Sequence, residues 1–173
     1  MNPAILLIDM QTGYLQHVPW RAQLVNNHKK ILRYSRKKDL PVIKIEFKGV
    51  GKGYTINDLF FEWVKIPQRS EIEKHHCNAF KETVLIDMLK IFGSDCLLAM
   101  GLFASECIYD TALGAKEHGF DIFTAYGLIA DGHIDHDSRR GVQEGTEQFY
   151  YEQGCPILGN TDEAISKLEE MLK

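Results

Sequence analysis

The stretch from Asp95 to Asp131 constrains the fold more than any other part of this chain. It opens with a continuous apolar run at 96–100, which is typical of a central parallel strand covered by helices on both faces. Ser105 then offers an N-cap, and apolar residues recur at helical spacing from Cys107 to Glu117. The pattern predicts a βαβ unit in which the start of a helix favours a thiolate at Cys107.

Apolar runs and amphipathic segments alternate along the rest of the chain. We expect strands over 4–8, 41–47, 71–75, 95–101, 121–125 and 156–158, and further helices over 20–38, 83–92, 137–153 and 161–173. Residues 56–64 form a short amphipathic segment. This alternation predicts an α/β fold, a three-layer Rossmann-like sandwich whose six-stranded parallel sheet carries helices on both faces. We expect one domain over 1–173 and the strand order 3-2-1-4-5-6. In that order Asp9 and the segment 101–107 share one crevice.

The composition argues against several classes of partner. A net charge of −4 over 173 residues, with no basic stripe, is unlike a nucleic-acid-binding protein. We find no apolar stretch long enough for a membrane span or a signal peptide, so we expect a cytoplasmic protein with no membrane partner. Four scattered cysteines without a CxxC pair fit a reducing compartment.

Three motifs carry a resemblance to a known family. They are Ile-Leu-Leu-Ile-Asp-Met-Gln at 5–11, Lys-His-His-Cys-Asn-Ala-Phe-Lys-Glu-Thr-Val-Leu at 74–85, and Gly-Leu-Phe-Ala-Ser-Glu-Cys-Ile-Tyr-Asp-Thr-Ala at 101–112. With these motifs in this order, the chain resembles the isochorismatase-like cysteine hydrolases over nearly its whole length. That family includes nicotinamidases and N-carbamoylsarcosine amidases.

The resemblance implies a catalytic triad of Asp9, Lys74 and Cys107. It also implies a non-proline cis peptide between Leu102 and Phe103, which turns the backbone N–H groups of Phe103 and Cys107 toward one point as an oxyanion hole. A thiol needs a nearby cation and a proton acceptor to become a nucleophile at neutral pH. Lys74 would supply the cation and Asp9 the acceptor.

The chemistry expected from these residues is hydrolysis of a small amide or carbamoyl compound through a thioester, with no cofactor. Two alternatives remain open: an isochorismatase-type hydrolysis of a vinyl ether, and an idle binding module of the same fold. The expected partner is a small-molecule substrate. By resemblance only, we also expect a homo-oligomer, a dimer or larger.

The chain departs from the family pattern at three places. Residues Glu46-Phe47-Lys48 stand where nicotinamidases carry an Asp-x-His motif that holds a metal, so we expect no metal and do not expect nicotinamide as the substrate. Thr12-Gly13-Tyr14 replaces a common Asn-Asp-Phe, and Gly114 stands where an aspartate is usual. None of these changes removes a triad member, but all three concern the pocket and its specificity.

Candidate substrate-pocket residues are Gln11, Tyr14, Phe47 and Phe103. The glycine-rich loop 48–54 fails the test for a phosphate-binding P-loop, because its lysine is followed by glycine rather than serine or threonine. We interpret it as a flexible loop beside the crevice, whose two lysines, Lys48 and Lys52, could contact an acidic group of the substrate.

Two histidine-rich segments resemble metal sites without fulfilling the requirements. In His75-His76-Cys77, neighbouring strand residues point to opposite faces and cannot chelate one ion together. His133 and His136 could approach a metal from a loop, but a solvated loop before a helix is the favoured interpretation. Cys96 and Cys155 are expected to fill the core.

Overall fold

The computed structural model describes residues 1–173, apart from the side chains at positions 138 and 139. Its strands form one parallel sheet in the order β3-β2-β1-β4-β5-β7, and β6 pairs with β4 beside this path. The strands are β1 (Pro3–Ile8), β2 (Val42–Phe47), β3 (Arg69–Lys74), β4 (Cys96–Leu102), β5 (Asp121–Ala125), β6 (Ile129–Ala130) and β7 (Ile157–Leu158).

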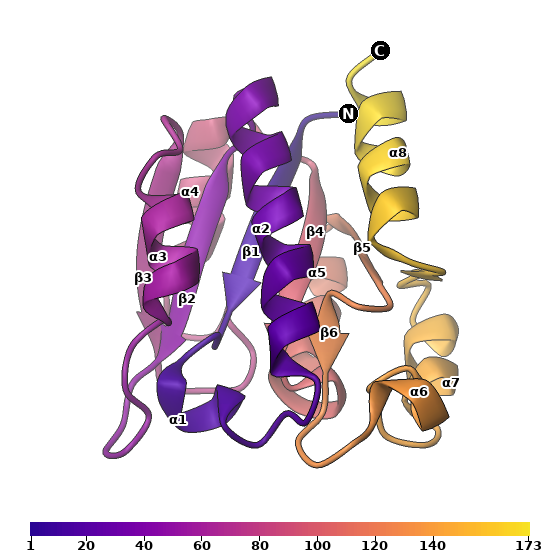
Figure 1. The fold of residues 1–173 in the computed structure, drawn as a ribbon. Coiled ribbons are helices and arrows are strands. Elements are labelled where there is room, and N and C mark those ends of the chain that lie inside the picture. The colour runs from indigo at the N-terminus through magenta and orange to yellow at the C-terminus, as the bar shows by residue number, and fades with distance from the viewer.

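Helices cover both faces of the sheet (Figure 1). They are α1 (Thr12–Leu15), α2 (Arg21–Lys38), α3 (Asn57–Trp63), α4 (Leu85–Phe92), the π-helix η1 (Ala104–Ile108), α5 (Tyr109–Glu117), α6 (His136–Arg139), α7 (Thr146–Glu152) and α8 (Thr161–Met171). Helices α2, α3 and α8 lie on one face, and α4 and α5 lie on the other. Among the described residues, no helix combines the length and the apolar character that crossing a bilayer requires.

The central strands are buried on both faces, which explains their unbroken apolar sequence. In β1, Ile5 and Leu7 pack into the core beneath α2, α3 and α8. Leu6 and Ile8 point the other way, into the core beneath α4 and α5. Every residue of β1 and of β4 is buried. Apolar side chains are therefore needed at consecutive positions, rather than at alternate ones.

The α/β fold and the path of the sheet agree with the sequence prediction. The predicted sixth strand is β7, whereas the short β6 and α1 were not expected. The predicted single helix over 137–153 is wrong, because α6 and α7 are separate helices. Arg140, Gly141 and Gly145 between them all have positive φ, and an α-helix cannot continue through that conformation.

Gly101, in β4, allows the two central strands to approach closely at the end of the sheet where Asp9 lies. It pairs with Ile8 in the parallel register, and its φ is 136°. A Cβ atom at this position would lie 1.8 Å from the carbonyl oxygen of Ile8. The Gly101 N–H donates to the Leu128 carbonyl at 2.9 Å, which also contacts His28 Nε2 at 2.8 Å. A glycine is therefore required where β1 and β4 lead into the crevice.

We predict that Gly101→Ala destabilises the protein by roughly 3 kcal/mol or more, since strain at a positive φ adds to a backbone clash. Gly93→Ala is the matched control. Gly93 also has a positive φ, of 64°, but a Cβ added there would meet no other group within 4 Å. It should cost only about 1–2 kcal/mol. Urea unfolding measures both, and equal losses would contradict the proposed close approach.

Candidate active site

Asp9 stands directly after β1, at the carboxyl edge of the sheet. Its N–H group donates to the Ile45 carbonyl at 2.9 Å, so the parallel ladder extends to this residue. Its φ is 52°, in the left-handed region that aspartate tolerates better than most residues. The backbone turns here, and the carboxylate is buried.

Lys74 ends the edge strand β3 and is fully buried. Its Nζ lies 2.8 Å from Asp9 Oδ2 and 4.5 Å from the centre of the Phe47 ring, on the intervening strand β2. The ammonium also donates to the carbonyl oxygens of His76 and Cys77, at 3.3 and 3.4 Å. A lysine is almost never fully buried unless it is paired. Its burial therefore depends on Asp9 and on these two carbonyl groups.

Cys107 lies in η1, immediately after the end of β4. The Leu102–Phe103 peptide is cis, as the family resemblance implied. The Phe103 carbonyl accepts from the N–H groups of both Glu106 and Ile108 at 3.1 Å, which gives this turn its π-helical form. The Cys107 side chain retains a small exposed surface, because the residue is 5% exposed.

Ser105 does not cap the helix, so this part of the prediction is wrong. The N-cap residue of η1 is Phe103, and Ser105 lies inside the π-helix. Both its N–H group and its hydroxyl donate to Asp131 Oδ1, at 2.9 and 2.8 Å. The other oxygen of Asp131 accepts from the Gln143 N–H at 2.7 Å. Asp131 thus holds the turn before Cys107 against the loop at 141–143.

The electrostatics of the three side chains correct a second expectation. Burial and, after it, the Asp9 carboxylate raise the pKa of the Cys107 thiol, and Lys74 only partly opposes them. Burial also raises the pKa of Asp9, against the lowering effects of Lys74 and of the neighbouring Cys107 thiol. These effects favour the thiol form of Cys107 over the expected thiolate. Asp9 beside it is a stronger proton acceptor than an exposed aspartate.

The Asp9 carboxylate retains free acceptor capacity. Within the described part of the chain, Oδ1 has no aligned hydrogen-bond donor, and the contact of Oδ2 with Lys74 is an ion pair without hydrogen-bond alignment. A buried oxygen without a donor is unusual in a folded protein. The carboxylate is thus free to take a proton from Cys107 or to contact an N–H group of a bound molecule.

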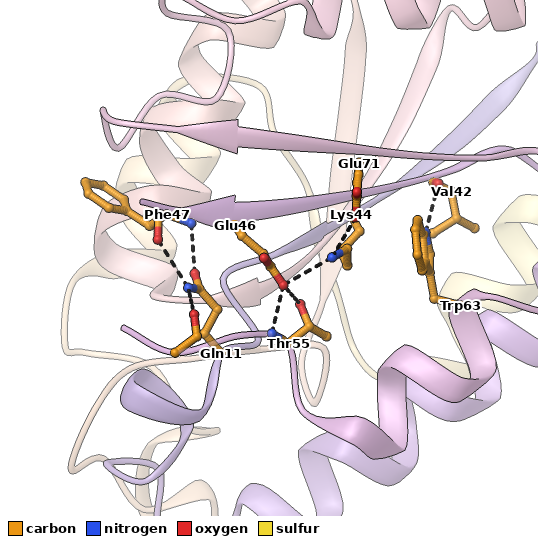
Figure 2. Close-up of polar contacts among 9 residues, drawn as sticks. Gln11, Val42, Lys44, Glu46, Phe47, Thr55, Trp63 and Glu71 are labelled. Carbon is orange, nitrogen blue, oxygen red and sulfur yellow. Dashed lines mark hydrogen bonds and ion pairs between the residues drawn. The ribbon is translucent and has the colours of Figure 1, made fainter. Parts of the chain in front are cut away.

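Gln11 is buried and serves the backbone around the crevice (Figure 2). Its amide nitrogen donates to the carbonyl groups of Phe47 and Gly53, and its oxygen accepts from the Phe47 N–H at 2.8 Å. Nearby, Glu46 accepts from the N–H and the hydroxyl of Thr55, at 2.8 and 2.6 Å. These bonds fix both ends of the loop 48–54. Gln11 therefore acts on the shape of the crevice through this loop.

Gly13, in the segment Thr12-Gly13-Tyr14 that differs from the family pattern, lies in a close backbone contact. The Gly13 N–H donates to the Lys52 carbonyl at 3.0 Å, and a Cβ at Gly13 would lie 2.3 Å from the Gly51 carbonyl oxygen. A Cβ at Gly53 would likewise lie 2.0 Å from the hydroxyl oxygen of Thr12. Glycines on both sides thus allow the loop 48–54 to lie directly against α1.

The three predicted aromatic pocket residues lie around the buried side chains. Tyr14 meets Phe103 edge-on at a centroid distance of 5.5 Å, and Phe47 lies against the ammonium of Lys74. Lys52 Nζ lies 4.5 Å from the Tyr14 ring centre, whereas Lys48 pairs with Glu73 at 2.5 Å on the surface. Of the two loop lysines, Lys52 is therefore the one directed toward the aromatic group.

Two supporting residues escaped the sequence analysis. Thr111 in α5 accepts from the Ala79 N–H at 3.0 Å and donates to the Cys77 carbonyl, which ties the segment after Lys74 to the helix that follows Cys107. Asp131 holds the other side of the turn. The sequence could have indicated Asp131, because this residue follows a short apolar run just as Asp9 does. No sequence pattern could have indicated Thr111, since its hydrogen-bond partners are backbone groups distant along the chain.

Gly114 in α5 leaves room for the side chain of Asn78. A Cβ at Gly114 would lie 2.4 Å from the side-chain oxygen of Asn78. The side chain of Asn78 therefore occupies the space beside α5 that a side chain at position 114 would need.

The histidines of the two segments make local contacts. His76 contacts Glu82 at 3.1 Å, the His133 ring lies tilted beside that of His17 at a centroid distance of 5.2 Å, and His136 lies beside Trp20. Among the residues that the structure describes, no group of three metal-binding side chains converges.

Residues 3–149 match the sequence model of the isochorismatase domain. The chain belongs to the isochorismatase family. Members of this family are hydrolases, and the matched residues include Asp9, Lys74 and Cys107.

The chain is also similar to individual proteins. The secreted isochorismatase effector Isc1 of Verticillium dahliae is 25% identical over 83 residues, which are 48% of this chain and 44% of that protein. The chain thus matches less than half the length of this relative. MAR1 ribonuclease from Caenorhabditis elegans has a TM-score of 0.80 at 17% identity, over 95% of this chain and 79% of that chain.

N-carbamoylsarcosine amidase from Thermoplasma acidophilum is a second solved structure that this chain resembles. It has a TM-score of 0.73 at 20% identity, over 94% of this chain and 98% of that chain. At these identities the likeness to both solved structures shows the fold alone.

We predict that Lys74→Met destabilises the protein by about 3–5 kcal/mol, because it leaves the Asp9 carboxylate buried without its partner. The double variant Asp9→Asn/Lys74→Met should recover more than half of that loss in urea unfolding. Lys48→Met with Glu73→Gln, the exposed pair, is the control and should show no comparable coupling. Additive losses at Asp9 and Lys74 would contradict the ion pair.

Proposed function

We propose that this protein hydrolyses the C–N bond of a small amide or carbamoyl compound without a metal or other cofactor. The observation that carries the proposal is the buried Asp9–Lys74 ion pair, which lies beside the thiol of Cys107. Removing charged groups from water costs free energy, and apolar residues of similar size often serve stability at least as well. A chain that needed only the fold would gain little from keeping two charges here.

In the proposed reaction, the sulfur of Cys107 attacks the carbonyl carbon while its proton passes to Asp9. The raised pKa of Asp9 supports this transfer, and Lys74 stabilises the negative charge that moves between sulfur and carboxylate. The oxyanion of the tetrahedral intermediate accepts hydrogen bonds from the N–H groups of Phe103 and Cys107. One such donor typically contributes about 3–4 kcal/mol to the barrier reduction.

The second half of the reaction reverses these roles. Asp9 gives its proton to the leaving nitrogen, ammonia or a small amine departs, and a thioester remains on Cys107. Asp9 then takes a proton from a water molecule that attacks the thioester, and the acid is released with the free thiol. Tyr14, Phe47 and Phe103 would surround the substrate, with Gln11 shaping the crevice through the loop 48–54.

Three broader expectations belong to this proposal. The scattered cysteines support a cytoplasmic location. The family resemblance supports an assembly of two or more copies, and the continuous sheet supports the assignment of 1–173 to a single domain. The expected partner remains a small molecule.

The test is ammonia release from a panel of small amides and carbamoyl compounds. We expect Cys107→Ala and Asp9→Asn each to lower kcat/KM roughly 10³-fold or more, because groups that act as a unit lose nearly all of their effect together. Cys155→Ala, at a buried cysteine with no proposed role, should retain activity. Full turnover by Cys107→Ala would refute the mechanism.

Adding a vinyl ether such as isochorismate to the panel separates the alternatives. A vinyl ether hydrolase would cleave that compound and release no ammonia from the amides, whereas an idle module would hydrolyse neither the vinyl ether nor the amides.

A further inference from the structure

A cavity of about 510 Å³ opens beside the turn that carries the nucleophile. Phe103 and Glu106, which both precede Cys107 in this turn, line the cavity together with His17 and His133. The cavity therefore borders the residues that would hold the substrate carbonyl in the proposed reaction. A substrate group that extends away from the reacting carbonyl can occupy this space.

Glu106 brings a negative charge to this cavity. It is exposed, and within the described part of the chain it forms no ion pair. The other lining carboxylate, Asp131, is nearly buried and already accepts three hydrogen bonds from Ser105 and Gln143. The described lining residues include no lysine or arginine. Glu106 is thus the carboxylate that remains available to a ligand.

The position of Glu106 is fixed relative to the nucleophile. It directly precedes Cys107, and its N–H donates to the Phe103 carbonyl within η1. Tyr14, which contacts the Phe103 ring, has a raised pKa chiefly because of burial and further because of the charges of Asp9, Cys107, Cys77 and Glu106. Glu106 and the triad therefore act electrostatically on the same aromatic side chain.

We propose that Glu106 determines specificity by binding a cationic group of the substrate, an ammonium or a guanidinium, in this cavity. This inference rests on the proposed amide hydrolysis, because it concerns the part of the substrate beyond the reacting carbonyl. Lys52 lies over Tyr14 but is not among the described residues lining this cavity. An anionic substrate bound by Lys52 is the opposite outcome, and the experiment below distinguishes the two.

Three amides of similar size and different charge provide the first test: γ-aminobutyramide, valeramide and succinamic acid. We expect kcat/KM to be highest for the cationic γ-aminobutyramide, about tenfold above neutral valeramide, and lowest for anionic succinamic acid. Glu106→Gln should bring the ratio of the first two close to one, and Glu106→Lys should invert it. Glu117→Gln, an exposed carboxylate farther along the same helical segment, should leave the ratio unchanged.

A second measurement does not require turnover. Methanethiosulfonate reagents transfer a charged thioalkyl group to a thiol and release a sulfinate, so each forms a mixed disulfide with Cys107. The rate at which each reagent modifies Cys107 is measured by peptide mass spectrometry. Dividing it by the rate of the same reagent with free cysteine removes the difference in intrinsic reactivity between the reagents. We expect the cationic reagent to react faster than the anionic one, with the difference reduced in Glu106→Gln and retained in Glu117→Gln.

The two measurements separate the possible failures. If no amide is hydrolysed but the reagent preference depends on Glu106, the cation site stands and the proposed reaction is wrong. If hydrolysis depends on Cys107 while charge has no effect in either measurement, the role of Glu106 is wrong and the reaction stands. A preference for succinamic acid and for the anionic reagent would assign recognition to Lys52 instead.

Discussion

The buried ion pair between Asp9 and Lys74 is the interaction on which the rest of the site depends. Each charge alone would be costly at this depth, and each is tolerated because the other lies 2.8 Å away. The pair also affects the protonation of Cys107. Burial and the Asp9 carboxylate raise the pKa of its thiol more than the Lys74 ammonium lowers it. The three side chains are therefore electrostatically coupled.

The fold makes this pairing possible through close approaches of the backbone. Gly101 brings the end of β4 against β1, and Gly13 allows the loop 48–54 to lie against α1. On the other side, Asp131 and Thr111 anchor the segments around the nucleophile turn and after Lys74. The glycines and polar side chains named here thus lie where segments distant in sequence contact one another.

Much of this arrangement could be predicted from local sequence. The apolar runs identify the central strands because those strands are buried on both faces, and parallel topology then brings Asp9 and the turn of Cys107 to one edge. The errors arose where tertiary contacts override local preference. Ser105 is a good N-cap residue, yet its hydroxyl bonds to Asp131. The protonation of Cys107 depends on burial and on Asp9, which no helical pattern reports.

The most direct test of this account is the ultraviolet absorbance of the Cys107 thiolate as a function of pH, taken as the difference between the wild-type protein and Cys107→Ala. The account predicts a pKa above the value of about 8.5 for a free cysteine. It also predicts that Asp9→Asn lowers this pKa, because the repelling carboxylate is gone while Lys74 remains. A thiolate already present at neutral pH, unchanged by Asp9→Asn, would contradict the account.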